Sequence, residues 1–546
     1  MNFKLIIVWL FITAIHFSNV TVAQTSTNTT TASKYENWYN LDPSSDNKFG
    51  MSVDKAYNEL LKDKKSKPII VAIIDSGVDI MHEDLQGKIW TNTAEIPGNG
   101  IDDDHNGYVD DVHGWNFLGN KKGENILYEN SEICRLYKKL DPKYKGLTLN
   151  MVKPEDTAEF HYYQRVKARF DEESDKAKKE ADKLATFAAN YQYADSIVCS
   201  FLKKSEFTLA ELNALNPDTV KSLKFSKDLL LFLYKQKGFN KSDFKEYLQQ
   251  VFAKHYCHYN LAFNPRELVG DNPEDITDTI YGNNDVIGLR PDHGTHVAGI
   301  VAANRNNGIG VKGVADNVQI MALRVVPDGD ERDKDIALAI RYAVKMGAKV
   351  INMSFGKEFS PQKKFVDDAV KFAEAKDVLI VHAAGNDGKD IDTAENYPSN
   401  TMLDKTRTIS NWITVGASSE EKNKDLPASF SNYGKKEVDV FAPGVSIYNL
   451  KPGNQYKEND GTSMASPMVT GVAALLRSYF PQLTAAQIKT CICNSVEKYS
   501  KKVYLPEEGS KKKTKVRFSE LSVSGGVVNA YNAVKLAEKM SSPTNN

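Results

Sequence analysis

The stretch PIIVAIIDSGVD, residues 68–79, decides the fold class of this chain. After Pro68 come six apolar residues, four of them isoleucine, and the run ends at Asp75. A continuous apolar, β-branched run predicts a parallel strand that is buried on both faces of its sheet. Similar runs follow later in the chain: VQIMALRVV (318–326), AKVINMSF (348–355), DVLIVHAAGN (377–386) and WITVGAS (412–418).

Helical patterns separate several of these runs. The segments 333–347 and 361–376 place apolar residues three and four positions apart, and Gly347 ends the first of them. Strands and helices in alternation predict an open, mostly parallel α/β sheet with helices on both faces.

The region 121–280 has a different character. One helical face carries a stripe of four large residues: Phe160, Tyr163, Val166 and Phe170. The segments 217–238 and 242–256 also have helical spacing, and strand patterns are absent from the region. We therefore predict an α-helical insertion domain whose aromatic stripes form its own core.

The N-terminus predicts export. In residues 1–23, Lys4 precedes a short apolar run and small residues lead up to Ala23, which is typical of a secretory signal peptide. An uncleaved membrane anchor is the alternative, but the run is short for a membrane span. We expect no integral membrane segment after cleavage, and a protein that is periplasmic, on the cell surface or extracellular.

The rest of the chain divides around the insertion. We assign 24–120 and 281–540 to one split α/β domain, and 541–546 to a tail. A formal net charge of −1 gives no electrostatic argument for a nucleic-acid partner. Five cysteines, an odd number, do not predict a disulfide framework.

A possible nucleophile lies in GTSMASP, residues 461–467. Apolar residues recur at helical spacing from Pro467, so Ser463 is predicted at a helix N-terminus, where unpaired N–H groups favour negative charge. Its hydroxyl could attack a carbonyl there. The alternative is that Ser463 merely caps the helix.

A nucleophilic serine needs a base, and the base needs a carboxylate. Asp75 ends a predicted strand, with Asp79 as a less well-placed competitor. In PDHGTHVAG, His293 stands at the start of a predicted helix, whereas His296, one turn later, is expected to pack or cap. The spacing lacks the glutamate of an H-E-x-x-H zinc site.

An oxyanion needs a donor besides the backbone N–H of the serine. Asn386 ends the strand in HAAGN, behind the small residues Ala383, Ala384 and Gly385. An amide side chain at that position can donate to developing negative charge.

The stretches IIDSGVD, HGTHVAG, AAGN and GTSMASP resemble the four signatures of the subtilisin-like serine proteases, and their order along the chain also agrees. The resemblance covers roughly residues 40–120 and 281–540 and implies a three-layer α/β fold. It implies that Asp75 orients, that His293 acts as base and then acid, that Ser463 attacks and that Asn386 stabilises the oxyanion.

The resemblance also implies a substrate site. The stretch NMSFG, residues 352–356, is similar to the edge segment that binds extended peptide by backbone pairing. The expected binding residues are Ser354, Phe355 and Gly356, with Ala383, Ala384 and Gly385 as one wall of a specificity pocket.

Two loops predict structural calcium. DDDHNGYVDD, residues 102–111, matches the opening of an EF-hand loop, although His113 stands where the closing glutamate would be. Its candidate ligands are Asp102, Asp104, Asn106, Tyr108, Asp110 and Asp111. The alternative is a solvated acidic turn without an ion. By resemblance, NNGIGVKG forms a second calcium loop, in which Asn307 joins Asp84. In both loops the ion would rigidify structure and take no part in the chemistry.

The sequence thus predicts a secreted serine endopeptidase that hydrolyses protein or peptide substrates through an acyl-enzyme at Ser463. A transpeptidase and a catalytically silent binding protein are the alternatives. About fifteen residues separate Ala23 from Trp38, too few for a folded propeptide. Because the insertion lies between Asp75 and His293, we expect it near the cleft rim, where it binds or restricts substrates.

Overall fold

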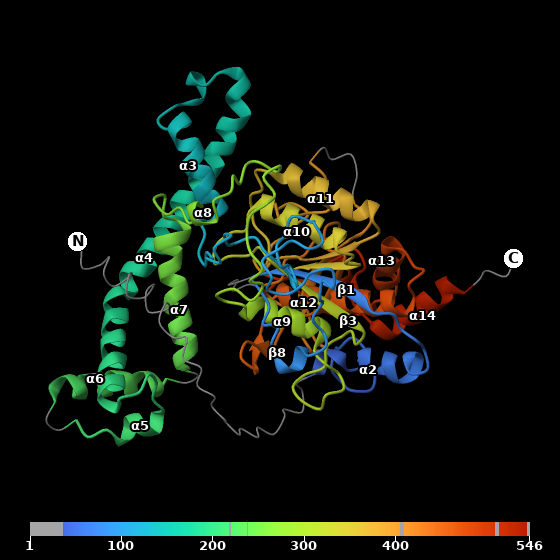
Figure 1. The fold of residues 1–546 in the computed structure, drawn as a ribbon, viewed down its shortest axis with the longest axis horizontal. Coiled ribbons are helices and arrows are strands. Elements are labelled where there is room, and N and C mark those ends of the chain that lie inside the picture. The colour runs from blue at the N-terminus through green and yellow to red at the C-terminus, as the bar shows by residue number, and fades with distance from the viewer. Residues whose placement is uncertain (1–36, 218–219, 237–238, 404–408, 508–512, 543–546) are drawn as a thin grey trace. The chain divides into compact units, whose positions relative to one another are not determined.

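The computed structural model describes residues 37–217, 220–236, 239–403, 409–507 and 513–542 (Figure 1). The predicted signal peptide and residues 543–546 of the predicted tail lie outside these ranges. By its internal contacts the chain divides into an α/β unit, residues 37–127 and 265–542, and a helical unit, Tyr128–Asn264.

A nine-stranded sheet organises the α/β unit, in the order β10-β13-β7-β6-β5-β4-β1-β3-β2. All neighbours are parallel except β10 and β13. The strands are β1 Ile69–Asp75, β2 Gly114–Asn116, β3 Val318–Arg324, β4 Val350–Met353, β5 Leu379–Ala383, β6 Trp412–Ser418, β7 Val440–Pro443, β10 Glu497–Lys498 and β13 Gly526–Val527. The mostly parallel sheet and its five predicted strands (β1, β3, β4, β5 and β6) are confirmed.

Two hairpin-like pairs lie outside this sheet. They are β8 Ile447–Lys451 with β9 Gln455–Asn459, and β11 Lys502–Tyr504 with β12 Lys515–Arg517.

Helices cover both faces of the sheet, as expected (Figure 1). Val71 and Ile73 of β1 pack in one core, with α9 and α12, whereas Ala72 and Ile74 pack in the other, with α10 and α11. This alternation explains why the strand is apolar from Ile69 to Ile74. The helices of this unit are α2 Val53–Lys55, α8 Arg266–Val269, α9 Asp292–Ala302, α10 Asp333–Lys345, α11 Lys363–Ala375, α12 Thr462–Tyr479, α13 Ala485–Asn494 and α14 Ala530–Ser541, with a π-helical turn at Ala56–Leu61.

Helix α12 starts earlier than the sequence predicted. It begins at Thr462, so Pro467 lies inside the helix and not in its first turn. Proline has no N–H, and the carbonyl of Ser463, four residues earlier, therefore lacks its intrahelical donor. The hydroxyl of Ser354 supplies the missing bond at 2.9 Å.

The helical unit is built around one long helix. Its elements are α3 Glu132–Tyr144, α4 Thr157–Leu202, α5 Leu209–Ala214, α6 Lys221–Tyr234 and α7 Lys241–Ala253, followed by a π-helical turn at Lys254–His258. The four residues of the predicted stripe on α4 are all buried. The unit is narrower than the predicted 121–280, because residues 121–127 and 265–280 belong to the α/β unit.

Two further findings concern the whole described chain. All five cysteines are free thiols. Among the described residues, none of the helices combines the length and the apolar character needed to cross a membrane.

Candidate active site

The four predicted catalytic residues lie where strands end and helices begin. Asp75 is the last residue of β1, and His293 lies in the first turn of α9. Ser463 lies in the first turn of α12, and Asn386 follows β5 by three residues. In parallel α/β sheets, binding and catalytic sites form at the carboxyl ends of the strands.

Asp75 and His293 form a direct hydrogen bond. Asp75 Oδ1 lies 2.7 Å from His293 Nδ1 and also accepts the N–H of Ser76 at 2.7 Å. Because an ionised carboxylate can only accept, Nδ1 carries the proton and Nε2 is left to accept one. The absence of a side chain at Gly294 permits this approach, since a Cβ there would lie 2.1 Å from the carbonyl oxygen of Gly77.

The environment of His293 sets its basicity. The partial burial of its ring lowers the pKa, but the charge of Asp75 and the hydrogen bond to it outweigh this effect, and the pKa is raised above its usual value. The Asp75 side chain is 1% exposed and that of His293 40%, so the imidazole is accessible while its partner is not.

The two competing residues are engaged elsewhere. His296 is buried, with Nε2 within 3.1 Å of the carbonyl oxygens of Ile447 and Lys457, and burial lowers its pKa to about 4. Asp79 accepts backbone N–H groups of Met81 and Gly453. His296 therefore holds strands β8 and β9, and Asp79 holds the backbone at Met81 and Gly453.

Ser463 is joined to the end of β4. Its hydroxyl donates to the carbonyl of Ser354 at 3.0 Å, and the hydroxyl of Ser354 donates to the carbonyl of Ser463. Strands β1 and β4 are neighbours whose register ends at Ile74 and Met353, one residue before Asp75 and Ser354. The Asp75–His293 pair and Ser463 thus stand at the ends of adjacent strands. A rotation about the Cα–Cβ bond of Ser463 redirects its hydroxyl away from the carbonyl of Ser354. The hydrogen bond between a nucleophilic serine and its base commonly forms only when substrate is bound.

Two N–H donors border one open space beside Ser463. The carbonyl oxygen of the Asn386 side chain accepts both the N–H and the hydroxyl of Thr462, each at 2.9 Å, so that amide is held in one orientation. A Cβ built on Gly461 would lie 3.5 Å from the backbone nitrogen of Ser463 and 3.6 Å from Asn386 Nδ2. Glycine leaves this space empty, and both donors can reach an oxygen placed in it.

The six predicted substrate-binding residues lie at the ends of two paired strands. Ser354, Phe355 and Gly356 follow β4, and Ala383, Ala384 and Gly385 end and follow β5.

One residue that the sequence did not single out lies between these two segments. Asn396 donates to the carbonyl of Ala384 at 3.2 Å. Its side-chain oxygen lies 3.3 Å and 3.6 Å from the positions of a Cβ on Gly356 and Gly385. Asn396 stands in the loop ENYPSNTM, residues 395–402, which carries no motif that could have pointed to it.

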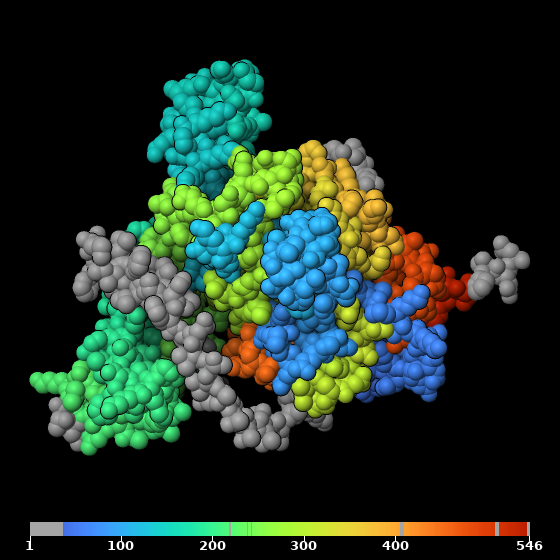
Figure 2. Space-filling view, viewed as in Figure 1, coloured from blue at the N-terminus to red at the C-terminus, as the bar shows by residue number. Residues whose placement is uncertain are grey.

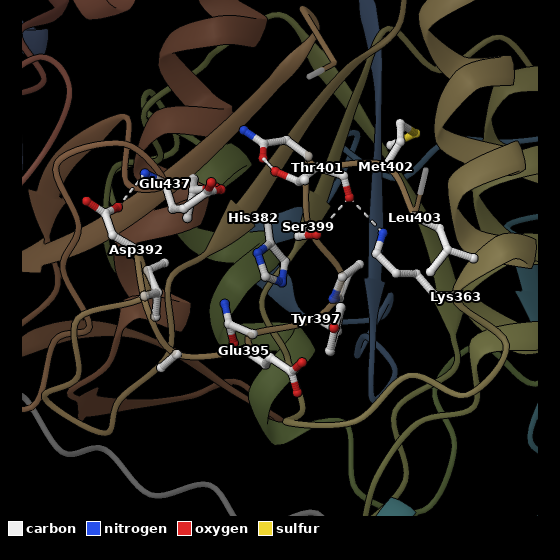
Figure 3. A pocket seen from close by; sticks show the side chains of 16 residues that line it. Lys363, His382, Asp392, Glu395, Tyr397, Ser399, Thr401, Met402, Leu403 and Glu437 are labelled. Carbon is white, nitrogen blue, oxygen red and sulfur yellow. Dashed lines mark hydrogen bonds between the residues drawn. The ribbon is translucent and has the colours of Figure 1, made fainter. Parts of the chain in front are cut away.

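A cavity of about 320 Å³ lies beyond Asn396, lined mainly by residues 391–403 (Figure 3). Figure 3 shows the His382 ring in its wall, with Asp392, Glu437 and Lys363 around it. Nε2 of His382 donates to the carbonyl of Phe355 at 2.8 Å, and burial lowers the pKa of this histidine to about 4. The ring is therefore neutral and supports the backbone of the predicted substrate segment.

The acidic loop assembles a different carboxylate cluster from the one predicted. Oxygens of Glu95, Asp104 and Asp111 all lie within 4.8 Å of one another, in a segment that is blue in Figure 2. Burial raises the pKa of Asp111 to about 6. Glu95 and Asp111 are buried and Asp104 is half-buried, and such crowding of carboxylates fits a calcium ion, whose preferred ligands are oxygens. The sequence pattern missed Glu95 because it lies outside the EF-hand-like stretch.

Other predicted ligands of that loop hold the loop itself. Asp102 accepts the N–H groups of Asn106 and Gly107, and Asp110 accepts those of residues 98–100. The amide nitrogen of Asn106 donates to Asp104 and Asp111. The ring of Tyr108 packs edge-on against Trp115 and Tyr342.

At the second predicted calcium site, Asp84 and Asn307 are adjacent. Asn307 Nδ2 donates to Asp84 Oδ1 at 2.7 Å, and the N–H of Val311 donates to Oδ2 at 3.0 Å. Burial raises the pKa of Asp84. The carboxylate is buried and lies against the loop, as a calcium site requires, but the amide nitrogen and not the amide oxygen of Asn307 faces it.

Comparison with known proteins agrees with this geometry. The model of the subtilase family matches residues 66–514, which is most of the chain. Subtilisin DY of Bacillus licheniformis is 41% identical over 198 residues, 36% of this chain and 67% of that protein. Thermitase of Thermoactinomyces vulgaris is 41% identical over 209 residues, 38% of this chain and 68% of that protein.

A third relative aligns with this chain over a smaller fraction of its own length than the first two. The thermophilic serine proteinase of Bacillus sp. (strain AK1) is 45% identical over 188 residues, which are 34% of this chain and 43% of that proteinase.

Proposed function

Since the chain belongs to the subtilase family of serine endopeptidases, we propose that it is an exported endopeptidase that cleaves peptide bonds through an acyl-enzyme at Ser463. The observation that carries this proposal is the 2.7 Å bond between Asp75 and His293 at the strand edge that also holds Ser463.

The proposed mechanism assigns one task to each group. His293 Nε2 takes the proton of the Ser463 hydroxyl as its oxygen attacks the substrate carbonyl. Asp75 keeps the imidazole in the required tautomer and stabilises the imidazolium. The negative oxygen of the tetrahedral intermediate accepts from the Ser463 backbone N–H and Asn386 Nδ2.

The intermediate then collapses in two stages. His293 gives its proton to the leaving amine, which departs and leaves an ester between Ser463 and the acyl part of the substrate. A water molecule, deprotonated by His293, attacks this ester, and its hydrolysis releases the acid product and restores the hydroxyl.

Substrate binding is proposed at the ends of β4 and β5. Residues 354–356 offer backbone groups for pairing with an extended peptide. The side chain next to the scissile bond enters between residues 354–356 and 383–385, and Asn396 closes the gap between them. This arrangement supports protein and peptide substrates.

Calcium is proposed as a structural ion, with Glu95, Asp104 and Asp111 as the better supported site. Its role is to neutralise three crowded carboxylates in a loop that is otherwise held by its own hydrogen bonds. Export is proposed from the N-terminal pattern, and the helical unit is proposed to bind or restrict substrates because it interrupts the chain between Asp75 and His293.

A fluorophosphonate probe tests the proposed activity. The full chain is expected to react at one serine, and Ser463→Ala is expected to abolish labelling. Ser466→Ala is the matched control, because Ser466 lies one turn along the same helix and donates to Asn352. Folded chain that resists labelling and cleaves no peptide would show a binding protein in place of an enzyme.

A further inference from the structure

Arg324 is a buried cation directly beside the candidate catalytic aspartate. It is the last residue of β3, and the parallel register places it opposite Asp75 of β1. Its side chain is 1% exposed. An arginine this deeply buried is unusual unless its charge is paired or its hydrogen bonds are satisfied.

The guanidinium of Arg324 donates to three neutral oxygens on three segments. Nε donates to the carbonyl of Ser76 at 3.0 Å, Nη1 to the side-chain oxygen of Asn116 at 2.9 Å and Nη2 to the carbonyl of Ile126 at 2.8 Å. Burial lowers the pKa of Arg324 to about 10, and the negative charge of Asp285 partly offsets this effect. The guanidinium therefore remains charged at neutral pH.

One of these bonds holds the catalytic carboxylate. Ser76 follows Asp75, and its N–H donates to Asp75 Oδ1, the oxygen that also binds His293. The carbonyl of the same Ser76 is fixed by Arg324. The main chain of Ser76 is therefore held on both sides of its Cα, at its N–H by Asp75 and at its carbonyl by Arg324.

The other two bonds reach the root of the helical insertion. We use "root" for residues 116–127 and 281–288, the segments of the α/β unit that lead to and from the inserted residues. The two root segments are joined by backbone bonds between Asn116 and Asn283 in both directions and by a side-chain bond of 2.9 Å between them.

The returning root segment also packs on Arg324. A Cβ on Gly288 would lie 2.2 Å from Arg324 Nε, so only glycine fits there. The next residues of the chain lead to His293. Arg324 thus touches the root on both sides of the insertion and the turn after Asp75.

We propose that Arg324 is a positioning residue that ties the Asp75–Ser76 turn to the root of the insertion and so fixes the carboxylate against His293. The inference rests on the proposed function, because the pair that it positions is the candidate catalytic pair. It also gives a physical route by which the presence of the insertion affects catalysis.

Arg324→Met tests this role, because methionine keeps apolar bulk and removes all three donors. We expect kcat on a short peptide to fall about 100-fold with KM changed less than about threefold, since a displacement of about 1 Å in a catalytic group has an effect of that size. Arg324→Lys keeps the charge and one possible bond, and we expect it to restore about a tenth to a half of the parent kcat.

Arg477→Met is the matched control. Arg477 is 4% exposed and also donates to backbone carbonyls, those of Leu483 and Asp377, at the other end of α12. The Arg477→Met variant removes a similarly buried arginine. It is expected to lower thermal stability without the fall in kcat expected for Arg324→Met. If Arg324→Met does not fold, the lysine variant decides the matter, and an unchanged kcat in it would overturn the proposal.

A spectroscopic readout separates this proposal from the proposed function. In the Ser463→Ala background, the downfield proton resonance of the Asp75–His293 hydrogen bond is recorded with and without Arg324→Met. Loss or an upfield shift of the resonance supports positioning, whatever the activity of the parent chain, and an unchanged resonance refutes it. An unlabelled, inactive parent chain would instead refute only the proposed function.

Discussion

Ser354 and Ser463 exchange hydrogen bonds, each hydroxyl donating to the main-chain carbonyl of the other residue, at 2.9 and 3.0 Å. The first of these bonds replaces the helical bond that Pro467 cannot make. The pair therefore joins the end of β4 to the first turn of α12, and the candidate nucleophile belongs to both.

Removing the Ser354 hydroxyl leaves the Ser463 carbonyl without a donor. We expect Ser354→Ala to lower the free energy of unfolding by about 1–3 kcal/mol, the usual range for a buried polar group left unsatisfied. Urea denaturation measures this change. In the Pro467→Ala background the new N–H can reach the same carbonyl, and the loss caused by Ser354→Ala should shrink. An equal loss in both backgrounds would contradict this account.

Asn386 is expected to act on the transition state and not on substrate binding. Asn386→Leu should lower kcat about 100- to 1,000-fold with KM nearly unchanged, the range known for the corresponding donor in subtilisin. Thr462→Val removes a hydroxyl that orients the amide. It should lower kcat less, because the backbone N–H of residue 462 still binds Asn386. Steady-state kinetics on a peptide anilide distinguish these results from a rise in KM.

The activity should fall at acidic pH, because His293 must be neutral to act as base. Its pKa is raised in the folded protein, and Asp75→Asn removes the charge that raises it. We expect that variant to lose about 10⁴-fold in kcat, as in other triads, and its remaining activity to have an acid limb at lower pH. Profiles of kcat/KM against pH measure both effects.

The same pair affects stability with a defined sign. Since the folded pKa of His293 lies above the unfolded value, the pair stabilises the protein below the unfolded pKa. This contribution is lost as the pH rises through the folded pKa. Thermal unfolding of Ser463→Ala with and without Asp75→Asn should converge as the pH rises through that range, and a gap that widens would contradict the assignment.

Calcium removal should destabilise the chain through the carboxylate cluster. We expect EGTA to lower the melting temperature of the parent, and Glu95→Gln to reduce that difference. Asp103→Asn is the control, because Asp103 lies in the same loop but outside the cluster. Since burial raises the pKa of Asp111 to about 6, calcium should protect more strongly at pH 8 than at pH 5. An EGTA effect equal in parent and Glu95→Gln would place the ion elsewhere.

The helical unit is expected to control which substrates are cleaved. Replacing Tyr128–Asn264 with a short Gly-Ser linker should raise kcat/KM for an unfolded protein relative to a short peptide. An unchanged ratio, with both substrates cleaved as before, would rule out a role in substrate restriction.

Much of the fold could be predicted because β1 is apolar from Ile69 to Ile74 and its neighbours β3 and β4 are largely apolar. The start of α12 could not, because the small residues before Pro467 carry no helical pattern. The length of α4 was also hidden, since its buried face continues beyond Phe170 through Ala177 and Ala181, set among charged residues.

The candidate site also contains residues that the sequence could predict and residues that it could not. Asp75, His293, Ser463 and Asn386 stand in short motifs, so sequence sufficed to propose them. Asn396 and Arg324 acquire their places through contacts with other segments of the chain, and Glu95 through the folding of its own loop, which a short motif does not encode. The opposite also occurs: Asp110 belongs to an acidic motif, yet it binds the backbone of its own loop.

The position of β1 between β4 and β3 has a consequence for how the chain is made. Its two partners in the sheet, β3 and β4, begin at Val318 and Val350, more than 240 residues beyond Asp75 along the chain. Both partners are therefore synthesised long after β1. Parallel pairing over such a separation forms slowly. The strand therefore spends synthesis without its hydrogen-bonding partners, and a nascent chain cut anywhere before residue 318 exposes six consecutive apolar residues to aggregation.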